Sequence, residues 1–328
     1  MDRRLKIAAK VTGGILATAA IAGAVSFWLT NKLVGIALDR NEDQGDDIPD
    51  EKISGDDPKM DLFMEIRDRE AERLESTPCE TVEITADDGI KLVGHFRKCK
   101  NAKRIIIAMH GWRSSWGKDF GIVSDFLYDS GCSVLYVEQR GQNNSGGEYM
   151  GFGLTERFDC LCWIRWIRER NIKKLPVYLY GISMGSATVL MASGAGEELV
   201  PDIHGIIADC GYTSPHAVWK HVAENNLHVL YTGWISSIAD EMCKRKISFG
   251  SKDYSCTEAL AKCQVPVLFI HGTDDTFVPI EMTYDNYKAC AAPKRLLVVP
   301  GAGHAMSYVT DRKLYEQTLR QFWKDYDR

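Results

Sequence analysis

Several sequence patterns that mark metal centres and nucleic-acid-binding surfaces are absent from this chain of 328 residues. Its ten cysteines include no C-x-x-C pair, and its eight histidines include no H-E-x-x-H spacing. Basic side chains do not cluster on a face, and the formal net charge is −5. These absences argue against a zinc site, a dithiol redox centre and a nucleic-acid partner.

Most of the cysteines lie in apolar surroundings, which is typical of core residues. Cys79 and Cys99 differ, because they flank a predicted hairpin with its turn at Asp88-Gly89. This hairpin would bring them nearly opposite one another, so a disulfide and two free thiols remain open alternatives.

The N-terminal segment has the pattern of a membrane anchor. Residues 1–10 carry four basic side chains and one acidic one, and residues 11–30 contain no charge, a length that suits one bilayer crossing. A cleaved signal peptide is the alternative, since Ala22-Gly23-Ala24 resembles a cleavage site. The apolar run continues past that point, which favours an uncleaved anchor. The leading basic residues predict a single-pass cell-membrane protein with a cytoplasmic N-terminus and the rest of the chain outside the cytoplasm.

An acidic stretch separates this segment from the rest of the chain. Residues 41–61 hold nine acidic side chains and almost no large apolar ones, which is typical of a solvated linker. We therefore expect an anchor or signal sequence over 1–40, a linker over 41–61 and one large domain over 62–328. This domain should begin with a helix over 62–75.

The large domain alternates apolar strands with helical patterns, which predicts an α/β fold with a mostly parallel sheet covered on both faces. A long insertion over 213–260 interrupts the alternation and should form a small helical cap over the site. The sequence predicts an antiparallel hairpin from strands 80–85 and 90–96. Further strands are expected over 104–109, 132–137, 177–182, 205–208, 265–270 and 295–299, and helices near 118–130, 155–170, 187–194, 280–290 and 311–325.

A serine between two glycines lies at the end of the strand over 177–182. Gly181-Ile182-Ser183-Met184-Gly185 joins this strand to a helix of small residues. A turn this tight leaves no room for a Cβ atom at either glycine. It would present the Ser183 hydroxyl at a helix N-terminus, where free N–H groups favour negative charge. The G-x-S-x-G pattern is that of a nucleophile elbow, so we expect Ser183 to be the nucleophile.

A serine nucleophile needs a base and an orienting acid, and candidates for both follow later strands. With this elbow the chain order is Ser, acid, His, so we assign Asp275 as the acid and His304 as the general base. Asp274 and Asp209 are alternatives for the acid. The spacing within 271–279 favours Asp275 over Asp274, and Asp209 is better explained as a strand-end carboxylate.

Acyl transfer also needs two N–H donors for the negatively charged oxygen that develops. The elbow would supply the N–H of Met184, and the loop after the strand over 104–109 would supply that of Trp112. His110 and His271 each precede a glycine at a strand end. We expect them to hold their loops by hydrogen bonds rather than to react.

Taken together, these motifs resemble the α/β-hydrolase superfamily. The resemblance rests on His110-Gly111, Gln139-Arg140-Gly141, the elbow, Ala208-Asp209-Cys210-Gly211-Tyr212, His271-Gly272-Thr273-Asp274-Asp275 and Gly303-His304. The resemblance extends over residues 78–326. Within the superfamily, the chain is similar to a bacterial branch of serine aminopeptidase (S33-like) and monoacylglycerol-lipase-like hydrolases, which includes membrane-anchored members. This resemblance implies an eight-stranded sheet, no cofactor and cleavage through an acyl-enzyme.

The chain departs from that branch in one loop. Relatives often have Arg-x-His-Gly-x-Ser, whereas this chain has Arg140-Gly141-Gln142-Asn143-Asn144-Ser145. The loop is expected to lie away from the triad, so the departure should affect local packing and the rim of the site.

The leading interpretation is a serine hydrolase that cleaves a small-molecule carboxylic ester. A peptidase of the aminopeptidase type would use the same triad and would need carboxylates to hold the substrate's amine. For this role the cap offers Glu224, Asp240 and Glu241. A non-catalytic, membrane-tethered binding protein on the same fold is the third alternative. Such proteins typically lack a triad residue, and this chain has all three.

Overall fold

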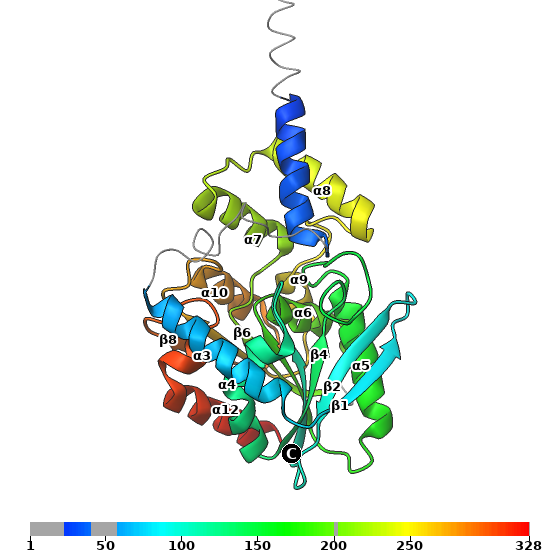
Figure 1. Cartoon of the computed structure of the whole chain (residues 1–328), viewed down its shortest axis with the longest axis vertical. Coiled ribbons are helices and arrows are strands. Elements are labelled where there is room, and N and C mark those ends of the chain that lie inside the picture. Colours follow the sequence, from blue (N-terminus) through cyan, green and yellow to red (C-terminus); the bar gives the residue numbers. More distant parts are fainter. Residues whose placement is uncertain (1–22, 41–57, 200–202, 328) are drawn as a thin grey trace, which may run out of the picture.

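An eight-stranded sheet forms the centre of the computed structural model, which describes residues 23–40, 58–199 and 203–327 (Figure 1). The strands lie in the order β1-β2-β4-β3-β5-β6-β7-β8. β1 and β2 form an antiparallel hairpin at one edge, and β3 to β8 run parallel. Their bounds are β1 (Glu80–Thr85), β2 (Lys91–Arg97), β3 (Arg104–Met109), β4 (Cys132–Glu138), β5 (Val177–Ile182), β6 (Ile203–Asp209), β7 (Val267–Gly272) and β8 (Lys294–Val299).

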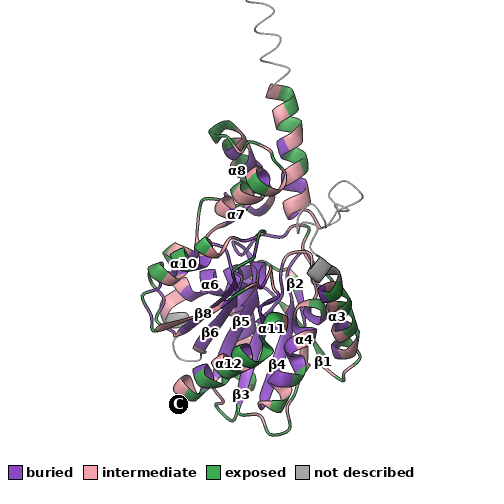
Figure 2. Cartoon of the chain, turned by 90° about the vertical axis from the view of Figure 1, so that its left-hand side faces the viewer, coloured by how far each residue is buried: buried purple, intermediate pink, exposed green. Residues whose placement is uncertain are grey.

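Helices cover both faces of this sheet, and its central strands are mostly apolar. β3, β4, β5 and β7 are buried at every position, as expected for parallel strands between two helical layers. One face packs on α4 (Trp116–Asp129) and α12 (Arg312–Tyr326), with α3 (Pro58–Glu75) outside α4 (Figure 2). The other face packs on α5 (Glu156–Arg170), α6 (Met184–Ala192) and α10 (Ile280–Ala289). The predicted α/β fold and its mostly parallel, eight-stranded sheet are confirmed.

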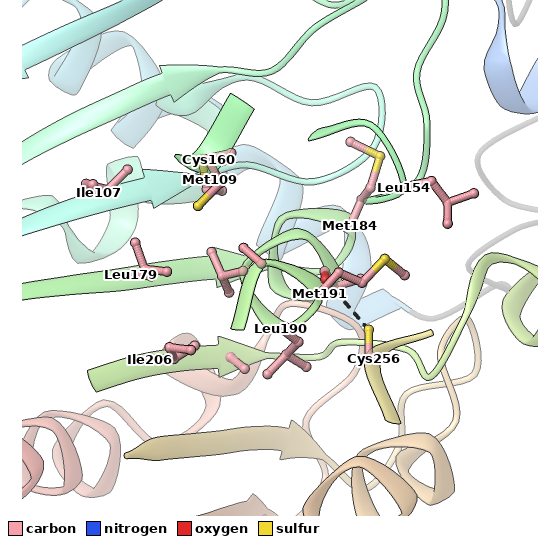
Figure 3. Close-up of a cluster of buried hydrophobic side chains, with 14 of the residues drawn as sticks. Ile107, Met109, Leu154, Cys160, Leu179, Met184, Leu190, Met191, Ile206 and Cys256 are labelled. Carbon is pink, nitrogen blue, oxygen red and sulfur yellow. Dashed lines mark hydrogen bonds between the residues drawn. The ribbon is translucent and has the colours of Figure 1, made fainter. Parts of the chain in front are cut away.

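The segment between β6 and β7 forms a helical layer above the end of the sheet (Figure 1). It contains α7 (Pro215–His221), the π-helical turn η2 (Val222–Asn226), α8 (Gly233–Ile247) and α9 (Cys256–Leu260). α9 packs on α6, where the Cys256 thiol donates a hydrogen bond to the Ala187 carbonyl over 3.6 Å (Figure 3). α6 therefore touches the sheet on one side and this layer on another.

A helix over residues 23–38 stands beside α7 and α8 at the same end of the molecule (Figures 1 and 2). Val34 and Leu38 on this helix are buried, whereas Val25, Phe27 and Trp28 are more than half exposed. The predicted membrane span over 11–30 and the predicted linker over 41–61 lie largely outside the described residues. None of the helices in the described part of the chain is long and apolar enough to cross a bilayer.

The alternative of a Cys79–Cys99 disulfide is corrected by the hairpin register. Both residues are free thiols. The ladder pairs Glu80 with Phe96, so the position opposite Cys79 is Arg97, two residues before Cys99. The chain has by then turned toward β4, and the Cys99 N–H donates to Ser133 Oγ over 3.0 Å.

Some predicted boundaries also shift by a few residues. The elbow helix begins at Met184 rather than at 187, and the strand expected over 265–270 is β7, from Val267 to Gly272. The helix begins early because Ser183 alone takes up the turn, with φ 54° and ψ −116°. Gly185 is therefore already a helical residue.

Candidate active site

Two glycines allow β5 to turn directly into α6. A Cβ atom at Gly181 would lie 2.2 Å from the Gly185 carbonyl oxygen, and one at Gly185 would lie 1.9 Å from the Met109 oxygen of β3. Both distances are well inside van der Waals contact, so the expected steric reason for the glycines is confirmed. Between them, Ser183 holds a positive φ that a non-glycine residue adopts only when its surroundings impose it.

Burial of α6 in the core holds the elbow in place. Met184, Leu190 and Met191 are fully buried and belong to the same core cluster as the strand residues Ile107 and Leu179 (Figure 3). The Ser183 N–H also donates to the Asp209 carbonyl over 2.9 Å. The backbone around the hydroxyl is therefore held by packing from below and by a hydrogen bond from β6.

Ser183, His304 and Asp275 form a chain of hydrogen bonds. His304 Nε2 lies 2.9 Å from Ser183 Oγ, and His304 Nδ1 lies 2.7 Å from Asp275 Oδ2. A carboxylate only accepts, so Nδ1 carries the proton and Nε2 is left to accept from the serine hydroxyl. This is the geometry in which an imidazole can remove the proton of a nucleophile.

The neighbouring Asp274 is turned away from this chain of hydrogen bonds. Its side chain is exposed and accepts from Thr273 Oγ1 over 2.7 Å. Asp275 is buried, and its Oδ1 accepts the backbone N–H groups of Phe277 and Val278 over 3.0 and 2.8 Å. Of the two adjacent carboxylates, the structure brings Asp275 to His304.

A second buried histidine supports the carboxylate of Asp275. His271 Nε2 lies 3.1 Å from Asp275 Oδ2 and 2.8 Å from the Val278 carbonyl oxygen. Both partners accept, so this nitrogen carries the proton, and His271 Nδ1 faces the Thr283 hydroxyl at 2.7 Å. His271 therefore holds the acid in place, in the non-reactive role expected from the sequence.

Opposite charges shift the pKa values of both partners in the Asp275–His304 pair. Burial alone would raise the pKa of Asp275, but His304 and His271 lower it well below its usual range. Burial likewise opposes a charge on His304, and the Asp275 carboxylate outweighs it, so the pKa of His304 is raised. The nearby Cys210 thiol adds no charge at neutral pH, because burial raises its pKa to about 11.

Asp209, the other alternative acid, is occupied elsewhere. Its Oδ2 accepts the Tyr315 hydroxyl over 2.8 Å, and no hydrogen bond joins it to His304 among the described residues. Burial raises the pKa of Asp209 to about 6. Its main chain anchors the elbow through the Ser183 N–H, which agrees with the expected strand-end role.

The loop after β3 brings Gly111, the residue before Trp112, close to the elbow. A Cβ atom on Gly111 would lie 3.4 Å from Ser183 Cβ, and the Gly111 N–H donates to Asp119 Oδ2 over 2.5 Å. Within the described chain, the backbone N–H groups of Trp112 and Met184 donate no hydrogen bond. The two N–H groups predicted as oxyanion donors are thus not occupied by another acceptor within the described residues.

His110 holds the base of this loop. Its Nδ1 donates to the Gly111 carbonyl over 2.8 Å, and its Nε2 accepts the Gln139 N–H over 3.1 Å. The ring is completely buried, and burial lowers the pKa of His110, so the neutral form is favoured. Two fixed hydrogen bonds to the backbone suit a structural residue.

The loop that departs from the family pattern reaches this region. Asn143 Nδ2 donates to the Ser114 carbonyl over 3.0 Å. Arg140 forms a buried ion pair with Asp159 and also binds Asp88 over 2.7 Å. Through the hydrogen bond from Asn143 to Ser114, this loop contacts the loop that carries Trp112.

An apolar cavity of about 110 Å³ adjoins the triad. The Phe277 ring forms part of its wall and meets the His304 ring edge to face, with centroids 5.0 Å apart. Among the described residues, no charged side chain lines it. The lining comes from five parts of the chain: Thr30, Leu33, Val34, Ile36 and Ala37 of the N-terminal helix; the single residues Trp112, Phe152 and Phe277; and Val218, Trp219, Val222, Ala223, Leu227, Tyr231, Ile235 and Ala239 of the cap.

The sequence analysis missed the contribution of residues 30–37 to this cavity. An apolar run gives the same signal whether it faces lipid or protein. The spacing of Thr30, Leu33, Val34 and Ala37, which places them on one side of a helix, is the signal that could have revealed it.

In the described chain, one group of side chains has ligand atoms close enough together for a metal ion: Cys210, Asp275 and His304, all within 4.8 Å. Asp275 and His304 already share a hydrogen bond through those atoms, and the Cys210 thiol is protonated at neutral pH. This arrangement suits proton transfer better than metal binding.

Comparisons with known proteins identify a family for this chain. A model described as the alpha/beta hydrolase family matches residues 106–316. The chain is 28% identical over 237 residues to the uncharacterized protein YqkD of Bacillus subtilis, which covers 71% of this chain and 75% of that protein. It is 26% identical over 208 residues to the lysophosphatidylserine lipase ABHD12 of Danio rerio, which covers 62% of this chain and 50% of the lipase.

Solved structures show a similar fold. The esterase Pf2001 of Pyrococcus furiosus superposes with a TM-score of 0.64 at 21% identity, covering 78% of this chain and 94% of the esterase. Est1E of Butyrivibrio proteoclasticus, solved with ferulic acid bound, superposes with a TM-score of 0.59 at 19% identity, covering 75% of this chain and 98% of Est1E. At these identities the likeness concerns the fold alone.

The charge coupling in the site can be tested by titration. In an Asp275→Asn variant the pKa of His304 should fall below the ordinary histidine value of about 6.5, because burial then acts without the carboxylate. The Asp274→Asn variant is the matched control and should leave the titration unchanged. Histidine side-chain NMR shifts measured against pH would report both. An unaltered His304 pKa in Asp275→Asn would mean that another group sets its charge.

Proposed function

Because the chain belongs to the alpha/beta hydrolase family, we propose that it is a serine hydrolase that cleaves carboxylic esters. The observation that carries this proposal is the continuous contact from Ser183 Oγ through His304 to Asp275, over 2.9 and 2.7 Å. The two free N–H groups beside the hydroxyl add the means to stabilise an oxyanion.

In the proposed reaction, Ser183 Oγ attacks the ester carbonyl carbon while His304 Nε2 takes the hydroxyl proton. The carbonyl oxygen becomes negative and accepts hydrogen bonds from the N–H groups of Met184 and Trp112. Collapse of this intermediate expels the alkoxide, which leaves as the alcohol with the proton from His304. Water then attacks the acyl-enzyme with His304 as base and releases the acid. Asp275 stabilises the imidazolium in both steps.

The apolar cavity supports a hydrocarbon acyl group as the part of the substrate that is recognised. Transfer of the acyl chain from water into this apolar cavity is favourable by about 0.8 kcal/mol for each CH₂ group buried. Esterase and lipase activities among the similar proteins are consistent with this preference. The natural substrate would be a small-molecule ester with an apolar acyl chain.

A peptidase function finds less support in the structure. None of Glu224, Asp240 and Glu241 lines the cavity. Asp240 pairs with Lys244 over 3.0 Å, and Glu241 pairs with Arg245 over 2.9 Å. A substrate ammonium group would therefore enter an apolar cavity without a carboxylate to bind it, which is costly.

We also propose that the N-terminal segment tethers the enzyme to the cell membrane, with the N-terminus in the cytoplasm and the hydrolase domain outside. The uncharged run over 11–30 and the basic residues before it support this arrangement. The exposed Val25, Phe27 and Trp28 would then have lipid instead of water as their neighbour. Ten free cysteines are more typical of a reducing compartment, so the orientation needs a direct test.

The nucleophile can be tested by removing its hydroxyl. Ser183→Ala should lower kcat for p-nitrophenyl acetate by on the order of 10⁶ and abolish labelling by a fluorophosphonate probe. Ser237→Ala, which removes an exposed hydroxyl of α8, is the control and should behave as the parent protein. Labelling that survives in Ser183→Ala would refute the assignment, and an inactive parent protein would favour the non-catalytic alternative.

The choice between ester and amide can be tested with paired substrates. The kcat/KM for p-nitrophenyl octanoate should exceed that for an aminoacyl p-nitroanilide by at least about 10²-fold, because the cavity offers an ammonium group no partner. Ser183→Ala should remove whichever activity is found. Faster cleavage of the anilide would make the peptidase the correct reading.

Topology can be tested by fusing reporters to the C-terminus of the full chain. Alkaline phosphatase, which is active only outside the cytoplasm, should be active in the fusion, and membrane washing with alkaline carbonate should not release it. A reporter that works only in the cytoplasm should be inactive at the same position. The reverse pattern would overturn the outward orientation.

A further inference from the structure

We propose that the helix over residues 23–38 is part of the active site, where it forms one wall of the acyl-binding cavity and holds the Trp112 loop in position. The proposal rests on the proposed ester hydrolysis and specifies how acyl groups are selected. It gives the N-terminal segment a role in substrate recognition in addition to any role as a tether.

The wall is built from one side of the helix. Thr30, Leu33, Val34 and Ala37 follow the i, i+3, i+4, i+7 spacing of a single helical face, and all four line the cavity. Thr30 and Val34 are only 2% and 3% exposed to solvent, whereas Ala24 on the same helix is exposed. The helix therefore has a protein-facing side that ends at the cavity.

The opposite wall comes from the cap. Val218 and Trp219 of α7 and Ile235 and Ala239 of α8 face the same cavity. Both views of the molecule show the helix over 23–38 standing beside these two helices (Figures 1 and 2). An acyl chain bound at Ser183 would lie between the N-terminal helix and the cap, so the space between them sets the length and width that fit.

The end of the helix also holds the loop that carries the second oxyanion donor. Arg113 Nη2 donates to the Ile36 carbonyl over 2.8 Å and to the Asp39 carbonyl over 2.6 Å. The indole Nε1 of Trp112 donates to the Ala37 carbonyl over 2.9 Å. The Ile36 and Ala37 carbonyls belong to the last helical turn, where carbonyls have no partner within the helix and favour a cation, and Asp39 follows directly after the helix.

These hydrogen bonds have a consequence for the backbone. Arg113 has φ 48°, a conformation that costs a non-glycine residue free energy unless its surroundings impose it. The contacts to Ile36 and Asp39 supply that constraint, and the Trp112 N–H is the donor immediately before it. Arg113 is therefore a positioning residue for the oxyanion donor.

The helix end is itself fastened to the domain at several points. Asp39 pairs with Lys246 of α8 over 2.7 Å, and Leu38 is completely buried with its carbonyl accepting the Met150 N–H. Arg40 donates to the carbonyls of Asn143 and Ser145 in the loop that departs from the family pattern. A segment that served only as a tether would not need these contacts, which instead fix the distance between wall and triad.

The wall can be tested with one substitution made on two sides of the helix. Ala37→Leu places extra methyl groups in the cavity, so the ratio of kcat/KM for p-nitrophenyl octanoate to that for the acetate should fall about tenfold or more. Ala24→Leu makes the same change on the exposed side and should leave the ratio within twofold of the parent. Both proteins are assayed as full chains in detergent, with melting temperature as the check on folding.

A second variant changes the cavity in the opposite direction. Leu33→Ala enlarges it, so kcat/KM for a dodecanoate ester should rise relative to that for the octanoate. If both variants fold and neither ratio moves while hydrolysis still depends on Ser183, the helix is not the wall. Hydrolysis that persists in Ser183→Ala would instead refute the proposed function, so the two failures are distinguishable.

The hydrogen bonds from Arg113 to the Ile36 and Asp39 carbonyls predict a different kinetic effect. Arg113→Met keeps much of the side-chain volume but cannot bind the two carbonyls. It should lower kcat on acetate and octanoate by the same factor, about tenfold or more, with little change in KM, because an oxyanion donor acts mainly in the transition state. Unchanged kcat, or a loss confined to the longer ester, would contradict a role in positioning Trp112.

Discussion

The close approach of α6 to the end of β3 is the constraint on which the arrangement around Ser183 depends. A single Cβ atom at Gly185 would overlap the Met109 carbonyl oxygen at 1.9 Å. Without it, the helix can begin one residue after the serine, and Ser183 is forced to positive φ at a cost of about 1–3 kcal/mol. Burial of Met184, Leu190 and Met191 offsets that cost. The strained turn therefore persists because the core below it is well packed.

The negative charge of the Asp275 carboxylate is likewise stabilised by the residues around it. Asp275 is buried, yet its two oxygens accept from two backbone N–H groups and from two histidines. A buried carboxylate with so many donors stays ionised and can hold His304 by its Nδ1. Asp274, one position earlier on the same turn, faces solvent and can do neither.

Local patterns made much of the site predictable. An apolar strand precedes each of Ser183, Asp275 and His304. Parallel strands bring such positions to one edge of a sheet, and in the structure these three side chains are joined there by hydrogen bonds. Contacts that depend on register or on distant segments were not accessible in this way. In the hairpin, the position opposite Cys79 is Arg97 and not Cys99, so the two thiols miss each other by two residues. Nothing in the sequence fixes this register.

The N-terminal helix shows the same limit more clearly. Apolar residues that would suit lipid also suit a protein cavity, so the uncharged run over 11–30 predicts a membrane span without revealing that Thr30 lines a cavity. The carbonyls of Ile36, Ala37 and Asp39 find their donors at Trp112 and Arg113, more than seventy positions along the chain. Such pairing is decided by the folded domain and leaves no local mark in the sequence.

The ion pair between Asp39 and Lys246 joins residues that are 207 positions apart. During synthesis the N-terminal helix leaves the ribosome first, whereas the loop and the cap helix that hold it are made later. Its cavity-facing side consequently has no cap helix to pack against until α7 and α8 have been made. The helix is made before the residues that hold it, and the lining of the cavity is incomplete until Phe277, thirty residues beyond the end of α8, has been added.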